Sequence, residues 1–315
     1  MSNELTNLQK QIQEALQLIQ AESALLPYPQ QHANQTLPAA EFGFEEPNSL
    51  LDKCAAVCAM YAQEKPTIRI IHHLACTGGT LISKCISVMP NTYLLSEVHP
   101  YTDLHVVKKN PQYMPSDLAS LSRYAGIPQL NNLQKELFIN SISTICNHLQ
   151  PLGGQLVLRD HTHSDFHTSI TPGKPSLVDT LSGHFNIKSV ITFRNPIDSY
   201  LSLKKNGWLR FSPSTFEEYC ARILLMLEVY ETVPIFHYES FVENPAETLI
   251  NICAALSIDY DDTWPGIFDI AQVSGDSGRS DNQISVRPRR ELDPETSREI
   301  LESESFHLIC SNFKY

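Results

Sequence analysis

A glycine pair separates a strand-like run from a helix-like run in the first third of the chain. Residues 68–74 (IRIIHHL) are largely β-branched and apolar, and residues 80–89 (TLISKCISVM) are typical of a helix. Gly78 and Gly79 let backbone N–H groups approach an anion closely, and a helix start adds partial positive charge. The stretch therefore predicts a phosphate-binding loop.

The loop does not fit the pattern of nucleoside-triphosphate hydrolases. If Gly79 is the second glycine of G-x-x-x-x-G-K-[ST], the first glycine is replaced by Leu74. Thr80 and Leu81 then replace the lysine and the hydroxyl residue. Three mismatches argue against ATP or GTP hydrolysis. Taken alone, the glycine pair also fits an ordinary turn between a core strand and a core helix.

A second stretch places a cation and a hydroxyl group at a helix start. Residues 190–193 (VITF) predict a buried strand that ends at Arg194, and Asn195 and Pro196 supply a helix cap and a first-turn proline. Ser202 lies two helical turns after Asn195, on nearly the same face. Arg194 and Ser202 can therefore converge on a phosphate. The alternative is an exposed arginine beside an ordinary capped helix.

Together the two stretches resemble the sulfotransferases that use 3′-phosphoadenosine 5′-phosphosulfate (PAPS). The resemblance assigns the 5′-phosphosulfate to the loop, whose residues are Cys76, Thr77, Gly78, Gly79, Thr80 and Leu81. It assigns the 3′-phosphate to Arg194 and Ser202. In this family a C-terminal loop with arginine and glycine closes over the 3′-phosphate, and Arg279 is the candidate for that role. The implied fold is the P-loop NTPase-like sulfotransferase fold, a three-layer α/β/α structure with a central parallel sheet.

The catalytic candidates follow the third predicted strand. Arg159-Asp160-His161 resembles the K-x-H segment that supplies the catalytic histidine and a phosphosulfate-contacting cation in cytosolic sulfotransferases. His161 is the first candidate for the base that takes the acceptor's proton, because its ordinary pKa is near neutral. His163 is two residues away, and other branches of the family use a glutamate, so His163 and Glu97 remain open as the base.

Cys76 is the main departure from the family, which carries lysine or arginine there against the bridging oxygen of PAPS. A neutral thiol cannot supply that charge. Either Arg159, Lys84 or a tail arginine compensates, or the protein binds the nucleotide without efficient transfer. A nucleophilic Cys76 is a further alternative, because a helix N-terminus lowers the pKa of a thiol. The adenine-stacking tryptophan of some members is replaced by Leu81.

Composition limits the class of protein. The 315-residue chain has a net charge of −12, which disfavours general nucleic-acid binding. No apolar run approaches the roughly 18 residues that cross a bilayer, and the first residues lack a signal-peptide pattern. The eight cysteines are scattered and indicate neither a disulfide framework nor a zinc site. These observations predict a cytoplasmic protein with reduced thiols and no metal.

Strands and helices alternate along residues 66–315, which predicts one α/β domain whose ligands bind at the carboxyl ends of parallel strands. Residues 1–65 precede it as a helical extension and connector. Apolar residues at three- and four-residue intervals predict an amphipathic helix there, which packs on its own domain or pairs two subunits in a homodimer. Residues 102–129 are polar and interrupted by proline, as in a lid or acceptor-binding insertion.

These features predict a sulfotransferase that moves a sulfuryl group from PAPS to a hydroxyl or amine of a small-molecule or glycan acceptor. Two alternatives remain. The first is a PAP- or PAPS-binding protein with weak or no catalysis, because Cys76 replaces the loop cation. The second is a nucleotide-dependent phosphotransferase on the same fold, which the absence of a loop lysine disfavours.

Overall fold

The computed structural model describes residues 65–102, 116–168, 175–271, 273 and 284–313. The predicted N-terminal helix, residues 103–115 of the predicted insertion, and Arg279 lie outside the described residues. Within the described part, no helix combines the length and the apolar character needed to span a membrane.

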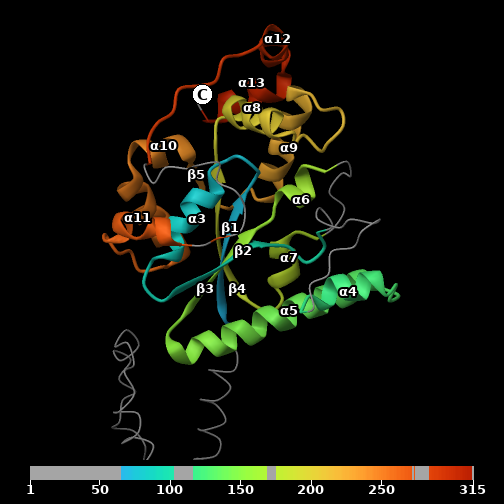
Figure 1. The fold of residues 1–315 in the computed structure, drawn as a ribbon, viewed down its shortest axis with the longest axis vertical. Helices are drawn as coiled ribbons and strands as arrows, with labels where there is room; N and C mark the ends of the chain where they lie inside the picture. Colours follow the sequence, from blue (N-terminus) through green and yellow to red (C-terminus); the bar gives the residue numbers. More distant parts are fainter. Residues whose placement is uncertain (1–64, 103–115, 169–174, 272, 274–283, 314–315) are drawn as a thin grey trace, which may run out of the picture. The chain divides into compact units, whose positions relative to one another are not determined.

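A five-stranded parallel sheet forms the centre of the α/β unit (Figure 1). Its order is β2 (Thr92–Val98), β3 (Gln155–Asp160), β1 (Thr67–His73), β4 (Asn186–Phe193), β5 (Ile235–His237). β1 is the central strand, with Ile71 opposite Arg159 on one side and Val190 on the other. The predicted parallel sheet is confirmed, and its central strand leads directly into the glycine loop.

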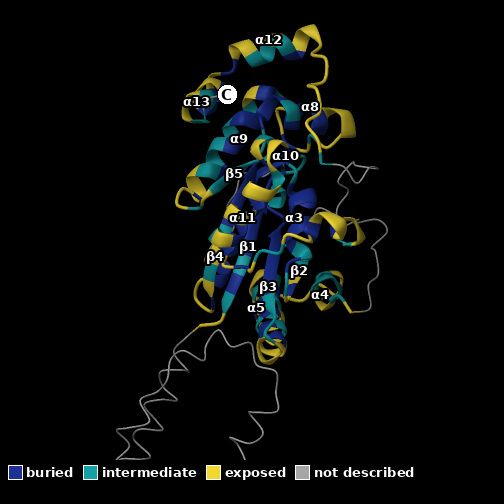
Figure 2. Cartoon of the chain, turned by 90° about the vertical axis from the view of Figure 1, so that its left-hand side faces the viewer, coloured by how far each residue is buried: buried dark blue, intermediate teal, exposed yellow. Residues whose placement is uncertain are grey.

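Helices cover both faces of this sheet. Ile71 packs in one cluster with α3 (Gly79–Ser87) and α11 (Pro245–Leu256). Ile70 packs in a second apolar cluster with α5 (Leu130–Leu149) and α7 (Leu177–Leu181). Neighbouring strand residues point to opposite faces, so this alternation places helices on both sides. The predicted three-layer α/β/α architecture is confirmed, and Figure 2 shows the sheet buried between helices whose outer surfaces are exposed.

A third apolar cluster lies toward the carboxyl ends of the strands, where Phe193 packs with α8 (Pro196–Asn206), α9 (Phe216–Val229) and α13 (Glu304–Phe313). Asn195 caps α8 as predicted, because its side chain accepts the N–H of Ile197 at 3.0 Å. The shorter helices are α4 (Leu118–Tyr124), α6 (His163–Phe166), α10 (Tyr238–Glu243), α12 (Pro294–Glu302) and the 3-10 turns η2 (Gln150–Leu152), η3 (Trp264–Gly266) and η4 (Phe268–Ile270).

Strand β2 continues beyond the predicted segment 92–95 as far as Val98. Its pairing with β3 shifts register between Leu95 and Val98, and Glu97 has a left-handed backbone with φ of 58°. Such an irregularity redirects a side chain at the end of a strand. It places Glu97 beside Arg159, the last residue but one of β3.

Candidate functional site

The predicted phosphate loop is the turn between β1 and α3. Gly78 precedes α3 with φ of 86°, and its carbonyl accepts hydrogen bonds from two N–H groups of the first helical turn. A Cβ atom on Gly78 would overlap the ring of Tyr238, and one on Gly79 would overlap the ring of His73. Both glycines are therefore required by close packing, and Gly78 also by its backbone conformation.

Replacing Gly78 tests this packing. We expect Gly78→Ala to lower the free energy of unfolding by about 2–4 kcal/mol, because left-handed strain and overlap with Tyr238 add together. Gly126→Ala is the matched control, since Gly126 has φ of 68° but nothing within 4 Å of the place that an added methyl group would take. Urea unfolding of both variants measures the difference. An equal loss of stability in the two variants would show that overlap with Tyr238 does not destabilise Gly78→Ala.

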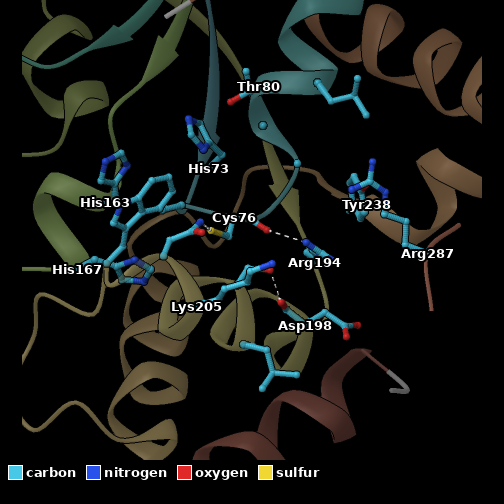
Figure 3. Close-up of a pocket in the computed structure, with 18 of the residues that line it drawn as sticks. His73, Cys76, Thr80, His163, His167, Arg194, Asp198, Lys205, Tyr238 and Arg287 are labelled. Carbon is cyan, nitrogen blue, oxygen red and sulfur yellow. Dashed lines mark hydrogen bonds between the residues drawn. The ribbon is translucent and has the colours of Figure 1, made fainter. Parts of the chain in front are cut away.

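A cavity of about 540 Å³ opens at the carboxyl edge of the sheet (Figure 3). It brings together most of the predicted site residues: Cys76, Gly78, Gly79, Thr80, Leu81, Glu97, Arg159, His161, Arg194 and Ser202. Thr77 is buried and does not line the cavity, and its hydroxyl donates to the carbonyl of Leu74 at 2.8 Å. Lys84, proposed from the sequence as a compensating cation, is also absent from the cavity wall.

Basic side chains dominate the polar wall of the cavity. They are Arg159, Arg194, Lys205, Arg210, Arg287 and Arg290. Among the described residues of the wall, two are carboxylates, and each is ion-paired: Glu97 with Arg159 at 3.1 Å, and Asp198 with Arg289 at 3.0 Å. In a chain with a net charge of −12, this concentration of positive charge favours an anionic ligand.

Arg194 and Ser202, which the sequence predicted to bind one phosphate, both line the cavity. One guanidinium nitrogen of Arg194 donates to the carbonyl of Cys76 at 3.2 Å, and the group lies over the Tyr238 ring, 4.9 Å from its centroid. Arg290 donates to Ser202 Oγ at 2.9 Å. The hydroxyl of Ser202, midway along α8, therefore lies beside the cation of Arg290, and a charged donor and a hydroxyl suit a phosphate group.

Arg290 and Arg287 come from the tail segment before α12 and were not singled out individually from the sequence. The sequence feature that could have identified them is the basic cluster at residues 287–290, which stands out in an acidic chain. Arg289 in the same segment makes a two-point ion pair with Asp198, at 3.0 and 3.2 Å. This contact holds the segment against α8, which brings its neighbours into the cavity wall.

Arg159 lies at the centre of the site and is only 2% exposed. Its guanidinium donates to His73 Nε2, Ser96 Oγ and Thr80 Oγ1, each at 2.8 Å, and to Glu97 at 3.1 Å. Burial lowers the pKa of Arg159 to about 10, and the nearby Glu97 opposes this shift. The side chain is therefore cationic at neutral pH, with its charge fixed beside the first turn of α3.

His73 helps to hold Arg159. Its Nδ1 donates to the carbonyl of Leu74 at 3.0 Å, and its Nε2 accepts from Arg159, so the ring is neutral. Burial and then the charge of Arg159 hold the pKa of His73 well below its usual value. The sequence showed no reason to select His73, because a histidine in an apolar strand is usually a core residue.

His161 lines the cavity immediately after β3 and is 2% exposed. Its Nδ1 lies 2.8 Å from Ser164 Oγ and 3.5 Å from Thr102 Oγ1, which fixes the orientation of the ring. The ring of His163 is edge-on to it, with centroids 3.8 Å apart. The structure therefore brings both histidine candidates into one site.

Two further histidines of the wall are held neutral. Burial, with smaller contributions from neighbouring histidines, keeps the pKa of His163 well below its usual value. Burial lowers the pKa of His167 to about 3, and the charge of Arg222 adds to the shift. His167 was not predicted from the sequence, which offers no pattern around it.

These shifts predict a dependence of stability on pH. His73, His163 and His167 are neutral when folded but take up protons near pH 6.5 when unfolded, so the unfolded state binds more protons below that pH. We expect the free energy of unfolding to fall as pH drops below about 6.5, by up to about 1.4 kcal/mol per pH unit for each histidine that stays neutral in the folded protein. Urea unfolding at several pH values measures how the free energy of unfolding depends on pH.

His167→Phe removes one of these groups and should make stability less dependent on pH. His184→Phe is the control, because His184 is exposed. The same slope in wild type and His167→Phe would show that His167 is not held neutral in the folded protein.

The thiol of Cys76 is not activated. Burial raises its pKa to about 11, against the lowering effect of Arg194 and Arg290. A protonated thiol at neutral pH argues against Cys76 as a nucleophile. Among the residues that the structure describes, no group of three or more His, Cys, Asp or Glu side chains is arranged to hold a metal ion.

Comparisons with known proteins gave remote structural similarities. No family model matches the chain, and no curated protein matches it. The chain is similar to the sulfotransferase domain of the Synechococcus PCC 7002 olefin synthase, with 17% identity and a TM-score of 0.45 over 80% of this chain and 96% of that one. It is also similar to the sulfotransferase domain from the curacin biosynthetic pathway, with 14% identity and a TM-score of 0.49 over 80% of this chain and 99% of that one. A mouse sulfotransferase complexed with PAP matches at 13% identity and a TM-score of 0.37, over 78% and 88% of the two chains.

Proposed function

We propose that the protein is a sulfotransferase that uses PAPS, with residues 66–315 as its transferase domain. The observation that carries this proposal is the cavity itself. One wall joins the glycine loop, the Arg194–Ser202 pair and the buried Arg159, and it is basic in an acidic protein. Two separate anion-binding regions in one cavity match a ligand with a phosphosulfate at one end and a second phosphate at the other.

The residues have distinct proposed roles in the transfer. An acceptor oxygen attacks the sulfur of PAPS, and the bond between that sulfur and the bridging oxygen of the 5′-phosphate breaks. The bonding electron pair stays on the phosphate oxygen, and the acceptor's proton passes to His161, which yields a sulfate ester and PAP. The loop N–H groups and Arg159 stabilise the charge that grows on the leaving phosphate.

We assign the base to His161 rather than Glu97. Glu97 is the counter-ion of Arg159 at 3.1 Å, and protonating it would leave that buried cation without its partner. His161 lines the same cavity, and Ser164 orients its ring at 2.8 Å. His163 is the weaker candidate, because burial keeps its pKa well below the range that suits a base at neutral pH.

Arg159 is the proposed replacement for the loop cation that Cys76 does not supply. It donates to Thr80 Oγ1 at 2.8 Å, so a fixed cation already stands at the loop. We therefore expect Cys76→Lys to change the transfer rate by less than about threefold, because the charge it adds is already supplied and Arg194 and Arg290 lie close by. Steady-state rates with PAPS measure this. A rise of tenfold or more would show that Arg159 does not compensate.

Turnover tests the proposed function. The protein is incubated with PAPS and a panel of hydroxyl and amine compounds, and release of PAP and of sulfated product is measured by chromatography. Product formation supports the sulfotransferase. The neutral thiol of Cys76 favours one second candidate, a protein that binds the nucleotide without turning it over. PAP binding without product from any acceptor would support that candidate instead.

A further inference from the structure

The wall of the cavity contains more cations than the proposed nucleotide site uses. Arg159 is assigned to the 5′-phosphosulfate, and Arg194 with Arg290 to the second phosphate. Lys205 and Arg210 also line the cavity, and neither has a place in this assignment. Since the chain as a whole has a net charge of −12, two further positive charges in one cavity point to a second anionic ligand.

Neither Lys205 nor Arg210 is neutralised by the protein. Both residues are exposed, and among the described residues neither has a hydrogen-bond or ion-pair partner. Lys204 shows the contrast, because its Nζ lies 3.2 Å from Asp293 and 2.9 Å from Thr296 Oγ1, outside the cavity wall. The two carboxylates in the described part of the wall are both ion-paired already. The charges of Lys205 and Arg210 are therefore available to a ligand.

The segment that follows α8 leads away from the region assigned to the second phosphate. Asn206, the last residue of α8, lies beside the glycine loop, with its side-chain nitrogen 4.0 Å from Cys76 Sγ. The ring centroids of Phe211 and His167 are 5.6 Å apart. In Figure 3, His167 lies on the opposite side of Cys76 from Arg194. The segment therefore leads from the loop to the histidine side of the cavity.

The histidine side is also the side of the proposed base. Figure 3 shows His163 on the same side as His167, and the ring centroid of His161 is 3.8 Å from that of His163. Arg210 directly precedes Phe211, which packs there. Because an acceptor has to reach the base, a cation on this side is placed to bind the acceptor and not the nucleotide.

Trp208 gives the same segment an apolar surface. It lines the cavity, is 37% exposed, and lies between Lys205 and Arg210 in the sequence. Its backbone N–H donates to the carbonyl of Leu203 at 3.0 Å, which fixes the turn after α8. An exposed indole packs against a flat ring, and lysine and arginine bind carboxylate or phosphate groups. The three side chains therefore suit a ring compound that carries a negative charge.

We infer that Lys205, Trp208 and Arg210 form an acceptor subsite for ring compounds that carry a carboxylate or phosphate group, and that this subsite rejects cationic compounds. The anionic group binds there and does not react, and the sulfuryl group passes to a separate hydroxyl or amine of the same compound. The inference rests on the proposed function and narrows its acceptor to anionic compounds.

The test compares four phenols that differ in charge at one position: 4-hydroxyphenylacetate, 4-hydroxybenzylphosphonate, the neutral 4-hydroxyphenylacetamide and the cationic tyramine. Binding of each to the PAP-saturated protein at pH 7 is titrated by ligand-observed NMR, so the result does not depend on turnover. We expect the two anions to bind about five- to tenfold more tightly than the amide, and tyramine to bind most weakly. The tighter of the two anions identifies the preferred group, carboxylate or phosphate. Added salt should reduce the preference for the anions.

Three variants test the residues. The double variant Lys205→Gln, Arg210→Gln removes both charges at exposed positions. It should weaken the two anions by about five- to tenfold and leave the amide and PAP within about twofold of wild type. Arg210→Glu should bind tyramine more tightly than 4-hydroxyphenylacetate. Lys204→Gln is the matched control on the same helix, and it should bind all four phenols as wild type does.

The outcomes separate the inference from the proposed function. Equal binding of the four phenols to wild type would overturn the inference, as would tighter binding of tyramine. A double variant that loses PAP as strongly as it loses the anions would also overturn it, because the two cations would then belong to the nucleotide site. Wild type that binds no PAP would refute the proposed function, and the inference with it. Wild type that binds PAP but shows no preference for anions would refute the inference alone.

Discussion

His161→Ala is expected to reduce sulfuryl transfer by about 10²- to 10⁴-fold, the usual contribution of a general base. PAP affinity should stay within about twofold of wild type, because the ring of His161 packs against that of His163, with centroids 3.8 Å apart, and His161 is not among the residues proposed to bind the phosphates. The side chain is buried, and Ser164 orients it at 2.8 Å. Steady-state transfer rates and calorimetric binding of PAP measure the two effects separately.

Glu97→Gln is the variant that challenges this assignment. It removes the carboxylate and leaves an amide oxygen that can still accept from Arg159, so it should lower the rate less than His161→Ala does. If His161→Ala stays active and Glu97→Gln loses transfer, the base is Glu97 and not His161.

Arg159→Gln is expected to have the second large effect. It should lower the transfer rate by about 10²- to 10³-fold, because it removes the fixed positive charge that is proposed to stabilise the leaving phosphate. It should also weaken PAP more than adenosine 3′-phosphate, which lacks the 5′-phosphate that Arg159 is proposed to contact. The variant should lose stability as well, since His73 and Glu97 both lose their partner.

Arg69→Gln separates the loss of stability from the loss of activity. Arg69 lies on the same central strand, and its guanidinium donates to the carbonyls of Leu256 and Ser257, away from the cavity. We expect this control to lose stability and keep its transfer rate. If Arg69→Gln and Arg159→Gln lose activity equally at temperatures where both are folded, Arg159 has no specific role in transfer.

Much of the fold is predictable from local patterns. The apolar runs that became β1, β3 and β4 are short, β-branched and bounded by turn residues, and the order of strands and helices implied the parallel sheet. Asn195 and Pro196 marked the start of α8 because capping is a local interaction. α12 and α13 were not predicted, because their position depends on tertiary contacts with α9 and the rest of the apolar cluster.

The site is predictable only where a motif carries it. The glycine loop, Arg194 and Ser202 have fixed spacing, and the structure places them in one cavity. His73 and His167 could not be found in the same way, because their roles depend on partners far away in the sequence. His73 meets Arg159 across two strands, 86 residues apart. Arg290 reaches Ser202 only because the tail segment folds back onto α8, 88 residues apart.

Calorimetric binding of PAP tests the central claim most directly. Titrations of PAP, 5′-AMP and ATP are compared for wild type and Arg194→Ala, with Arg298→Ala as the control, since Arg298 is exposed and outside the cavity wall. We expect wild type to prefer PAP, and Arg194→Ala to weaken PAP by about 10- to 100-fold, the loss of a charge-assisted phosphate contact. Arg298→Ala should bind as wild type does. Failure to bind PAP, or a preference for ATP, would contradict the sulfotransferase assignment.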